Sequence, residues 1–155
     1  MSILSTLGIK PPGGCHYPLT GWAEFARLVQ PLIERDIYGK VFSESITPPN
    51  LIKAAFTSDK RDELALEFDQ PVVWSDALTN QFHLNGSPIK IMGGSVRGRI
   101  LTLTLSAPTT SQKLTYLDSK SWNPDNLLYG ANGIAALTFC EVPCHPFGLA
   151  PNANP

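Results

Sequence analysis

The chain has 155 residues, a formal net charge of −1 and a charged fraction of 16%. That length suits one ordinary domain, or one small domain with part of another. The sequence has no basic run, which argues against a nucleic-acid-binding protein, and no apolar segment near the roughly 20 residues that a membrane span needs. Residues 1–12 lack the basic start and the long apolar core of a signal peptide.

The first part of the chain is predicted to form a strand, a loop and a helix. Residues 2–9 are apolar and partly β-branched, which predicts a buried strand. The Pro-Pro-Gly-Gly run of residues 11–14 predicts a tight loop. From Thr20, which suits a helix N-cap, apolar residues recur at spacings of three and four and predict one apolar helix face. That face consists of Trp22, Phe25, Ala26, Val29, Leu32 and Ile33.

From about residue 46 onward the apolar pattern changes from helical to alternating. The chain has 14 Pro and 12 Gly, and many of them separate short apolar runs. Short strands at such intervals predict a mainly β fold, an antiparallel β-sandwich. Turns are expected at Asn85-Gly86 and at Gly93-Gly94. The expected strands are residues 51–58, 63–69, 71–74, 81–86, 88–94, 99–107, 113–118 and 132–143.

His16 is the main candidate for catalysis. It follows the Gly-rich loop, between an expected strand end and a helix start, where α/β enzymes place catalytic groups. An imidazole titrates near neutral pH, so it suits a general base that takes a proton from a serine. On these residues alone, a histidine that only hydrogen-bonds its own loop is the simpler interpretation, because no partner accompanies it.

The stretch GGCHYPLTGWAEFARLVQPLIERDIYG (13–39) resembles the histidine block of the SGNH hydrolases. It is most similar to the bacterial branch of sialate O-acetylesterases and acetyl-xylan-esterase-like proteins. The stretches ELALEFDQPVVW (63–74) and LLYGANGIAALTFCEVP (127–143) resemble the β-sandwich that follows the catalytic domain in that branch. The resemblance covers about residues 2–143. It implies a remnant of the α/β esterase domain over residues 1–45, a β-sandwich accessory domain over 46–144 and a disordered tail over 145–155.

The resemblance implies that His16 is the catalytic base of a serine ester hydrolase that acts on O-acetylated carbohydrates. Two departures matter. Gly13 stands where many members have an aspartate, so the third member of the triad has no assigned residue. No Gly-Asp-Ser nucleophile block precedes His16, and neither do the Gly and Asn donors of an oxyanion hole. We therefore expect a fragment that is inactive alone and whose partner is a missing N-terminal catalytic part.

The cellular location of this chain is left open by its sequence, whereas the resemblance implies that intact relatives are secreted or periplasmic.

The alternative function is a non-catalytic β-sandwich that binds glycans or packs on a catalytic domain. Four aromatic residues are candidates for a sugar-stacking platform, but burial of all four in the sandwich core is the simpler interpretation. Trp122 is the most loop-like of them, so it is the candidate sugar-stacking residue. The other three are Trp74, Tyr116 and Tyr129. An uncovered helix face is expected to cause self-association through Trp22, Phe25, Val29 and Leu32.

The sequence around the other serines and around His83 argues against a second set of catalytic residues. Ser75 looks turn-like, and Ser95 lies in GGSVRG, which lacks the G-x-S-x-G spacing of a nucleophile elbow and predicts a hairpin turn. His83 alternates with apolar neighbours, which predicts a position on the solvent face of a strand.

Neither a metal nor an organic cofactor is expected. The three cysteines, Cys15, Cys140 and Cys144, do not have zinc-finger spacing. We expect Cys140 to be a buried strand thiol and Cys144 a terminal thiol, with their disulfide state left open. The oxygen-rich residues between Asp118 and Asn126 do not follow an EF-hand loop, so turn chemistry is expected there.

Overall fold

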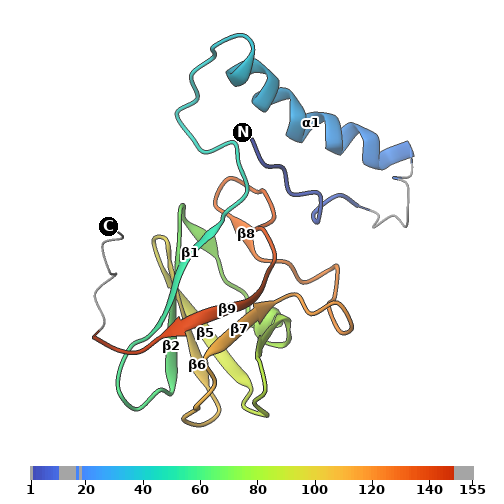
Figure 1. Cartoon of the computed structure of the whole chain (residues 1–155). Helices are drawn as coiled ribbons and strands as arrows, with labels where there is room; N and C mark the ends of the chain where they lie inside the picture. The colour runs from blue at the N-terminus through green and yellow to red at the C-terminus, as the bar shows by residue number, and fades with distance from the viewer. Residues whose placement is uncertain (1, 11–16, 18, 149–155) are drawn as a thin grey trace.

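The computed structural model describes residues 2–10, 17 and 19–148. The strands gather in one body, and α1 (Leu19–Asp36) lies beyond one end of it (Figure 1). The mainly β fold predicted from the sequence is confirmed. Within these residues no helix combines the length and the apolar character that a bilayer crossing requires.

Seven strands form one mixed sheet, in the order β4-β7-β9-β1-β2-β6-β5. All neighbours in it are antiparallel except β1 and β9. A second sheet pairs two short strands, β3 and β8. The bounds are β1 (Leu51–Phe56), β2 (Glu63–Phe68), β3 (Val72–Val73), the 3-10 helix η1 (Asp76–Gln81), β4 (Phe82–Leu84), β5 (Ile91–Arg97), β6 (Ile100–Leu105), β7 (Lys113–Tyr116), β8 (Tyr129–Gly130) and β9 (Phe139–His145).

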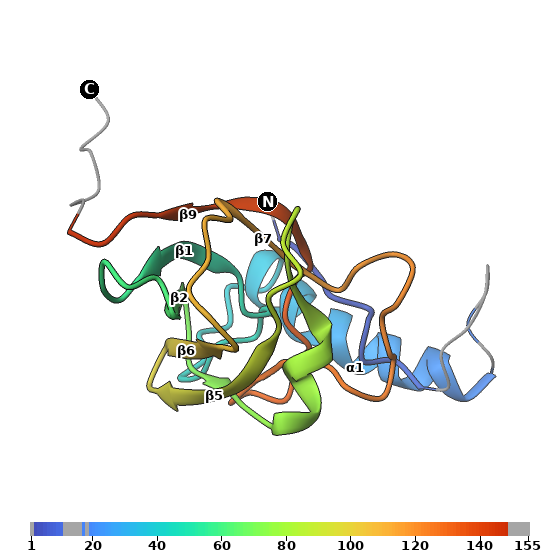
Figure 2. The same cartoon turned by 90° about the horizontal axis from the view of Figure 1, so that it is seen from below.

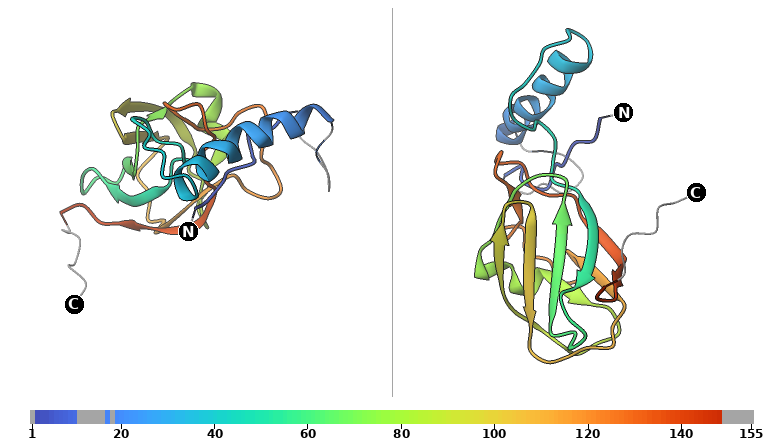
Figure 3. Two further views of the ribbon diagram at one scale, coloured as in Figure 1. Left: turned by 90° about the horizontal axis from the view of Figure 1, so that it is seen from above. Right: turned by 90° about the vertical axis from the view of Figure 1, so that its left-hand side faces the viewer.

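Strand β9 joins two layers of the body. Its first part pairs antiparallel with β7, whereas Cys144 and His145 pair parallel with β1. The register with β7 shifts, and Glu141 within β9 has a φ of 53°. This irregular strand therefore passes from the β4–β7 layer to the β1–β2–β6–β5 layer, and the sheet curls until it nearly closes (Figures 2 and 3). The parallel contact distinguishes the fold from the purely antiparallel sandwich that the sequence predicts.

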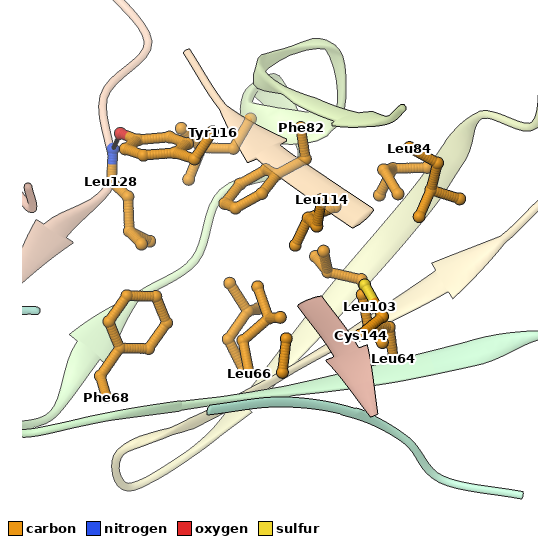
Figure 4. Close-up of a cluster of buried hydrophobic side chains, with 14 of the residues drawn as sticks. Leu64, Leu66, Phe68, Phe82, Leu84, Leu103, Leu114, Tyr116, Leu128 and Cys144 are labelled. Atoms are coloured by element: carbon orange, nitrogen blue, oxygen red, sulfur yellow. Dashed lines mark hydrogen bonds between the residues drawn. The ribbon is translucent and has the colours of Figure 1, made fainter. Parts of the chain in front are cut away.

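The core lies between these layers. Alternate residues of β2 and β6 point into it, as the alternating sequence pattern predicts: Leu64, Leu66, Phe68, Leu101, Leu103 and Leu105 are buried. Figure 4 shows Leu66 and Phe68 on one side and Tyr116 and Phe82 on the other. The Tyr116 hydroxyl accepts a hydrogen bond from the backbone N–H of Leu128 at 2.6 Å, and burial raises the pKa of Tyr116.

The expected strand over residues 2–9 does not form. A strand needs a neighbour to satisfy its backbone groups, and none of the described strands pairs with this segment. Ile9 is nevertheless buried, in a small cluster with Leu28 of α1 and Ile134 of the body. The segment therefore packs through side chains instead of joining the sheet.

Helix α1 begins and ends close to the predicted residues, but its apolar face is only partly covered. Leu28 and Leu32 are buried, whereas Trp22 is 51% and Ile33 43% exposed. The cluster of Ile9, Leu28 and Ile134 is small, so it covers one strip of the helix.

The turn expected at Gly93-Gly94 is wrong. Both glycines lie inside β5, and the chain reverses at Gly98, which has a φ of 62°. Gly94 serves packing: a Cβ there would lie 2.7 Å from the ring of Trp74. Ser95 is consequently a strand residue and not part of a hairpin turn. The expected turn at Asn85-Gly86 is present, and Gly86 has a φ of 71°.

The prediction that Cys140 is the buried thiol of β9 and Cys144 a terminal one is wrong. Cys140 is exposed and Cys144 is buried, and neither forms a disulfide. The irregularity at Glu141 and the crossing of β9 to the second layer decide which thiol faces the core. The strand also runs to His145, inside the segment expected to be a tail, and residues 149–155 lie outside the described part.

Candidate functional site

His16 and Gly13 lie outside the described residues, so the catalytic role of His16 stays a prediction. The described residues nearest to them in sequence are Lys10 and Tyr17. The Lys10 ammonium lies 2.8 Å from the carboxylate of Asp125, in the loop between β7 and β8. The Tyr17 ring packs edge-on against Trp22 of α1, with ring centroids 5.4 Å apart. Lys10, before His16 in sequence, therefore contacts the loop between β7 and β8, and Tyr17, directly after His16, contacts α1.

The loop between β7 and β8 carries Trp122, whose exposed fraction is 39%. At its start, the carboxylate of Asp118 accepts hydrogen bonds from the backbone N–H of Lys120 at 3.1 Å and from the Ser121 hydroxyl at 3.3 Å. The hydrogen bond from Lys120 is the main cause that holds the pKa of Asp118 below its ordinary value. Asp118 therefore shapes the turn, as the sequence predicts.

Gln81 fixes the base of this loop and was missed by the sequence analysis. Its side chain is 1% exposed. The amide nitrogen donates to the carbonyl of Asn123 at 2.6 Å and to that of Asn126, and the amide oxygen accepts from the N–H of Asn123 at 3.1 Å. A fully paired buried amide makes a loop rigid, because leaving any of these groups unpaired is costly. Trp122 is thus presented by a fixed loop.

The other three candidate aromatic residues do not form a platform with Trp122. Tyr116 is buried in the core. Trp74 is half-buried, packs near Phe82, and its indole N–H donates to the Asp76 carboxylate at 2.9 Å. Tyr129 is half-buried and packs near Gly8. Trp122 is therefore the one of the four that stands free for a ligand.

The two alternative serine nucleophiles gain no support. Ser75 immediately precedes η1, and Ser95 lies in the edge strand β5. Neither makes a hydrogen bond to a histidine within the described part of the chain. A triad within these residues would need such a bond between hydroxyl and imidazole.

The thiols and imidazoles are dispersed. Cys144 is 5% exposed, and burial raises its pKa to about 11. Residues 2–10, 17 and 19–148 contain no group of three or more His, Cys, Asp or Glu side chains placed to hold a metal ion. His83 is half-buried in β4, and its Nε2 atom is buried without a partner among the described residues. Its two neighbours in β4, Phe82 and Leu84, are buried, so His83 lies on the predicted outer face of the strand but is only partly exposed there.

Comparison with solved structures finds a similar fold in a carbohydrate acetylesterase from Xanthomonas citri, with a TM-score of 0.58 and 17% sequence identity. The match covers 85% of this chain and 30% of that one, so this chain spans less than a third of the enzyme. At that identity the likeness concerns the fold alone. An S-layer protein matches over 83% of this chain and 17% of its own length at 17% identity, but its TM-score of 0.47 supports no argument. No protein-family model matches, and no curated protein shows significant sequence similarity.

Proposed function

We propose that this chain is the C-terminal part of a carbohydrate O-acetylesterase of the SGNH type, in the sialate O-acetylesterase-like and acetyl-xylan-esterase-like branch. In this proposal residues 1–45 complete a catalytic domain whose nucleophile lies on a separate part of the enzyme. Residues 46–144 form the accessory β domain. The observation that carries the proposal is the fold match to part of a carbohydrate acetylesterase over 85% of this chain.

His16 would be the catalytic base. A serine of the catalytic part attacks the acetyl carbonyl while His16 accepts the serine proton, and His16 then donates that proton to the departing sugar oxygen. Water, deprotonated by His16, hydrolyses the acetyl-enzyme, releases acetate and regenerates the serine. Donors on the catalytic part would stabilise the oxyanion in both steps.

Helix α1 supplies the contact surface for that catalytic part. Large apolar side chains of α1 remain exposed, notably Leu19 at 92% and Trp22 at 51%. Exposed apolar residues that cluster on one element commonly mark an interface. Phe25 and Val29 are half-buried and Leu32 is buried, so the exposed surface is narrower than the face expected from the sequence. Without the catalytic part, the same surface is where the chain would associate with itself.

The test is an esterase assay with p-nitrophenyl acetate and with acetylated xylan. The chain alone should hydrolyse neither substrate faster than its His16→Ala variant does. When the catalytic part is supplied, either separately or fused ahead of residue 1, activity should appear. The His16→Ala substitution should then lower kcat by roughly 10⁴-fold or more. Equal activity of the two assembled proteins would refute the role of His16.

The alternative function is a glycan-binding module, favoured by the exposed Trp122 on a loop that Gln81 holds in place. A flat indole suits the apolar face of a sugar ring. Titration with xylan and sialylated oligosaccharides, followed by tryptophan fluorescence, tests it. Trp122→Ala should abolish the response, whereas Trp22→Ala, which removes another exposed indole, should keep it.

A further inference from the structure

A cleft of about 380 Å³ lies where the nearly closed sheet leaves a seam. The strands β4 and β5 are the two ends of the strand order, and side chains of both line this cleft. The 3-10 helix η1 and the loop that holds Trp122 contribute Asn80 and Ser121 to its wall. The volume falls in the range of sites for small molecules.

Lys90 lines the cleft, and no aspartate or glutamate does, although Asp118 accepts a hydrogen bond from the lining residue Ser121. Lys90 is exposed and forms no ion pair with any described residue. Its backbone is fixed by two hydrogen bonds with Ser106, at 3.1 and 2.9 Å. An unpaired ammonium among lining residues that include no carboxylate favours an anionic ligand.

Some of the polar side chains that line the cleft already have hydrogen-bond partners, and others have none among the described residues. The Ser121 hydroxyl donates to Asp118, and the Ser87 hydroxyl is paired with Thr109. The Asn80 amide, in contrast, is exposed and makes no hydrogen bond to a described residue. The Asn80 amide thus supplies hydrogen-bonding capacity in the same cleft as the Lys90 ammonium.

We propose that this cleft binds an acidic sugar residue, a hexuronate, through its carboxylate. Lys90 pairs with the carboxylate, and Asn80 hydrogen-bonds the ring hydroxyls. Ile89 and Pro88 line the cleft and offer an apolar surface to the C–H face of the ring. That the ligand carries a carboxylate rests on the cleft itself, and that it is a sugar rests on the proposed function. The site lies on the β body and contains neither His16 nor Trp122.

The experiment is an NMR titration of the whole chain with D-glucuronate, D-glucose and acetate, read by backbone amide shifts. Glucuronate should shift the signals of Asn80, Lys90 and Ser121 with a dissociation constant of about 1 mM, typical of a weak single-sugar site. Glucose and acetate should bind at least about tenfold more weakly, because each offers only part of the recognised groups.

The matched variants are Lys90→Gln and Lys60→Gln, since Lys60 is also exposed but does not line the cleft. Lys90→Gln should weaken glucuronate binding about tenfold, and Lys60→Gln should leave it unchanged. The proposal is wrong if glucuronate shifts no cleft signal, if both variants behave alike, or if acetate or glucose binds as well as glucuronate. The titration needs no catalytic part, so its failure is distinct from a failed esterase assay.

Discussion

The β body and the N-terminal segment with α1 differ in how completely each buries its apolar side chains. The main core cluster lies within residues 54–144, and Leu64, Leu66, Leu101 and Leu103 in it have no exposed surface. The second cluster has only Ile9, Leu28 and Ile134 as buried members, and Ile134 belongs to the β body. The body therefore supplies its own core, whereas α1 relies on the body for a narrow contact and leaves the rest of its apolar surface uncovered.

The largest expected effect concerns the core of the body. Leu66→Ala should lower the free energy of unfolding by about 2–5 kcal/mol, because it removes buried methyl groups and leaves a cavity. Leu19→Ala, in the exposed first turn of α1, should change the free energy by less than about 0.5 kcal/mol. Urea denaturation followed by far-UV circular dichroism measures both. Similar losses in the two variants would show that α1 is as well packed as the body.

The next effect compares the two thiols of β9. Burial raises the pKa of Cys144 to about 11, so its reactive thiolate should be roughly a hundredfold scarcer at pH 8 than that of an ordinary thiol. Cys140 is exposed and should react with iodoacetamide first. Mass spectrometry of peptides after timed labelling separates the two rates. Equal rates in the native protein would mean that β9 opens readily from the core.

Gly94 and Gly93 provide a matched pair within one strand. Gly94→Ala places a methyl group 2.7 Å from the Trp74 ring and should cost about 1–3 kcal/mol of stability through overpacking. Gly93→Ala meets no atom within 4 Å and should cost less. Thermal unfolding of both variants measures the difference. A loss in Gly93→Ala as large as that in Gly94→Ala would remove the packing explanation.

A small effect on stability is expected from Trp22→Ser in α1. Trp22 is half-exposed and packs edge-on against Tyr17 and Phe25, so the free energy of unfolding should fall by about 1 kcal/mol. Self-association of the chain should nevertheless weaken, because an exposed indole is removed from the uncovered surface. Light scattering over a concentration series, with Trp122→Ser as control, tests this. A wild-type chain that is monomeric throughout would contradict the expected association.

Local patterns predicted the elements whose causes are local. The spacing of apolar residues predicted α1, although the helix begins at Leu19 and Thr20, the expected N-cap, lies inside it. Asn85-Gly86 predicted a turn that is present. The alternation of Leu and Thr in residues 100–105 predicted a strand with one buried face. These signals worked because helical periodicity, strand alternation and glycine turns depend on near neighbours in the chain.

The candidate site was predicted less well, because the hydrogen bonds that hold it come from residues far away in the sequence. Trp122 was recognised as a loop residue, but Gln81, 42 positions away from Asn123, was not recognised as its anchor. A lone glutamine before a strand carries no signal of burial. The cleft was also missed, since Lys90 and Asn80 line one cleft only because the fold brings β4 and β5, the two ends of the strand order, to the same cleft.

The sequence by itself determined that this is a mainly β chain with one amphipathic helix, because those properties follow from composition and periodicity. Only the tertiary structure decided that residues 2–9 have no strand partner, that Cys144 and not Cys140 enters the core, and that β9 pairs with both β7 and β1. Each of these outcomes depends on which strands become neighbours. Strand pairing joins residues far apart in sequence, and no short pattern encodes it.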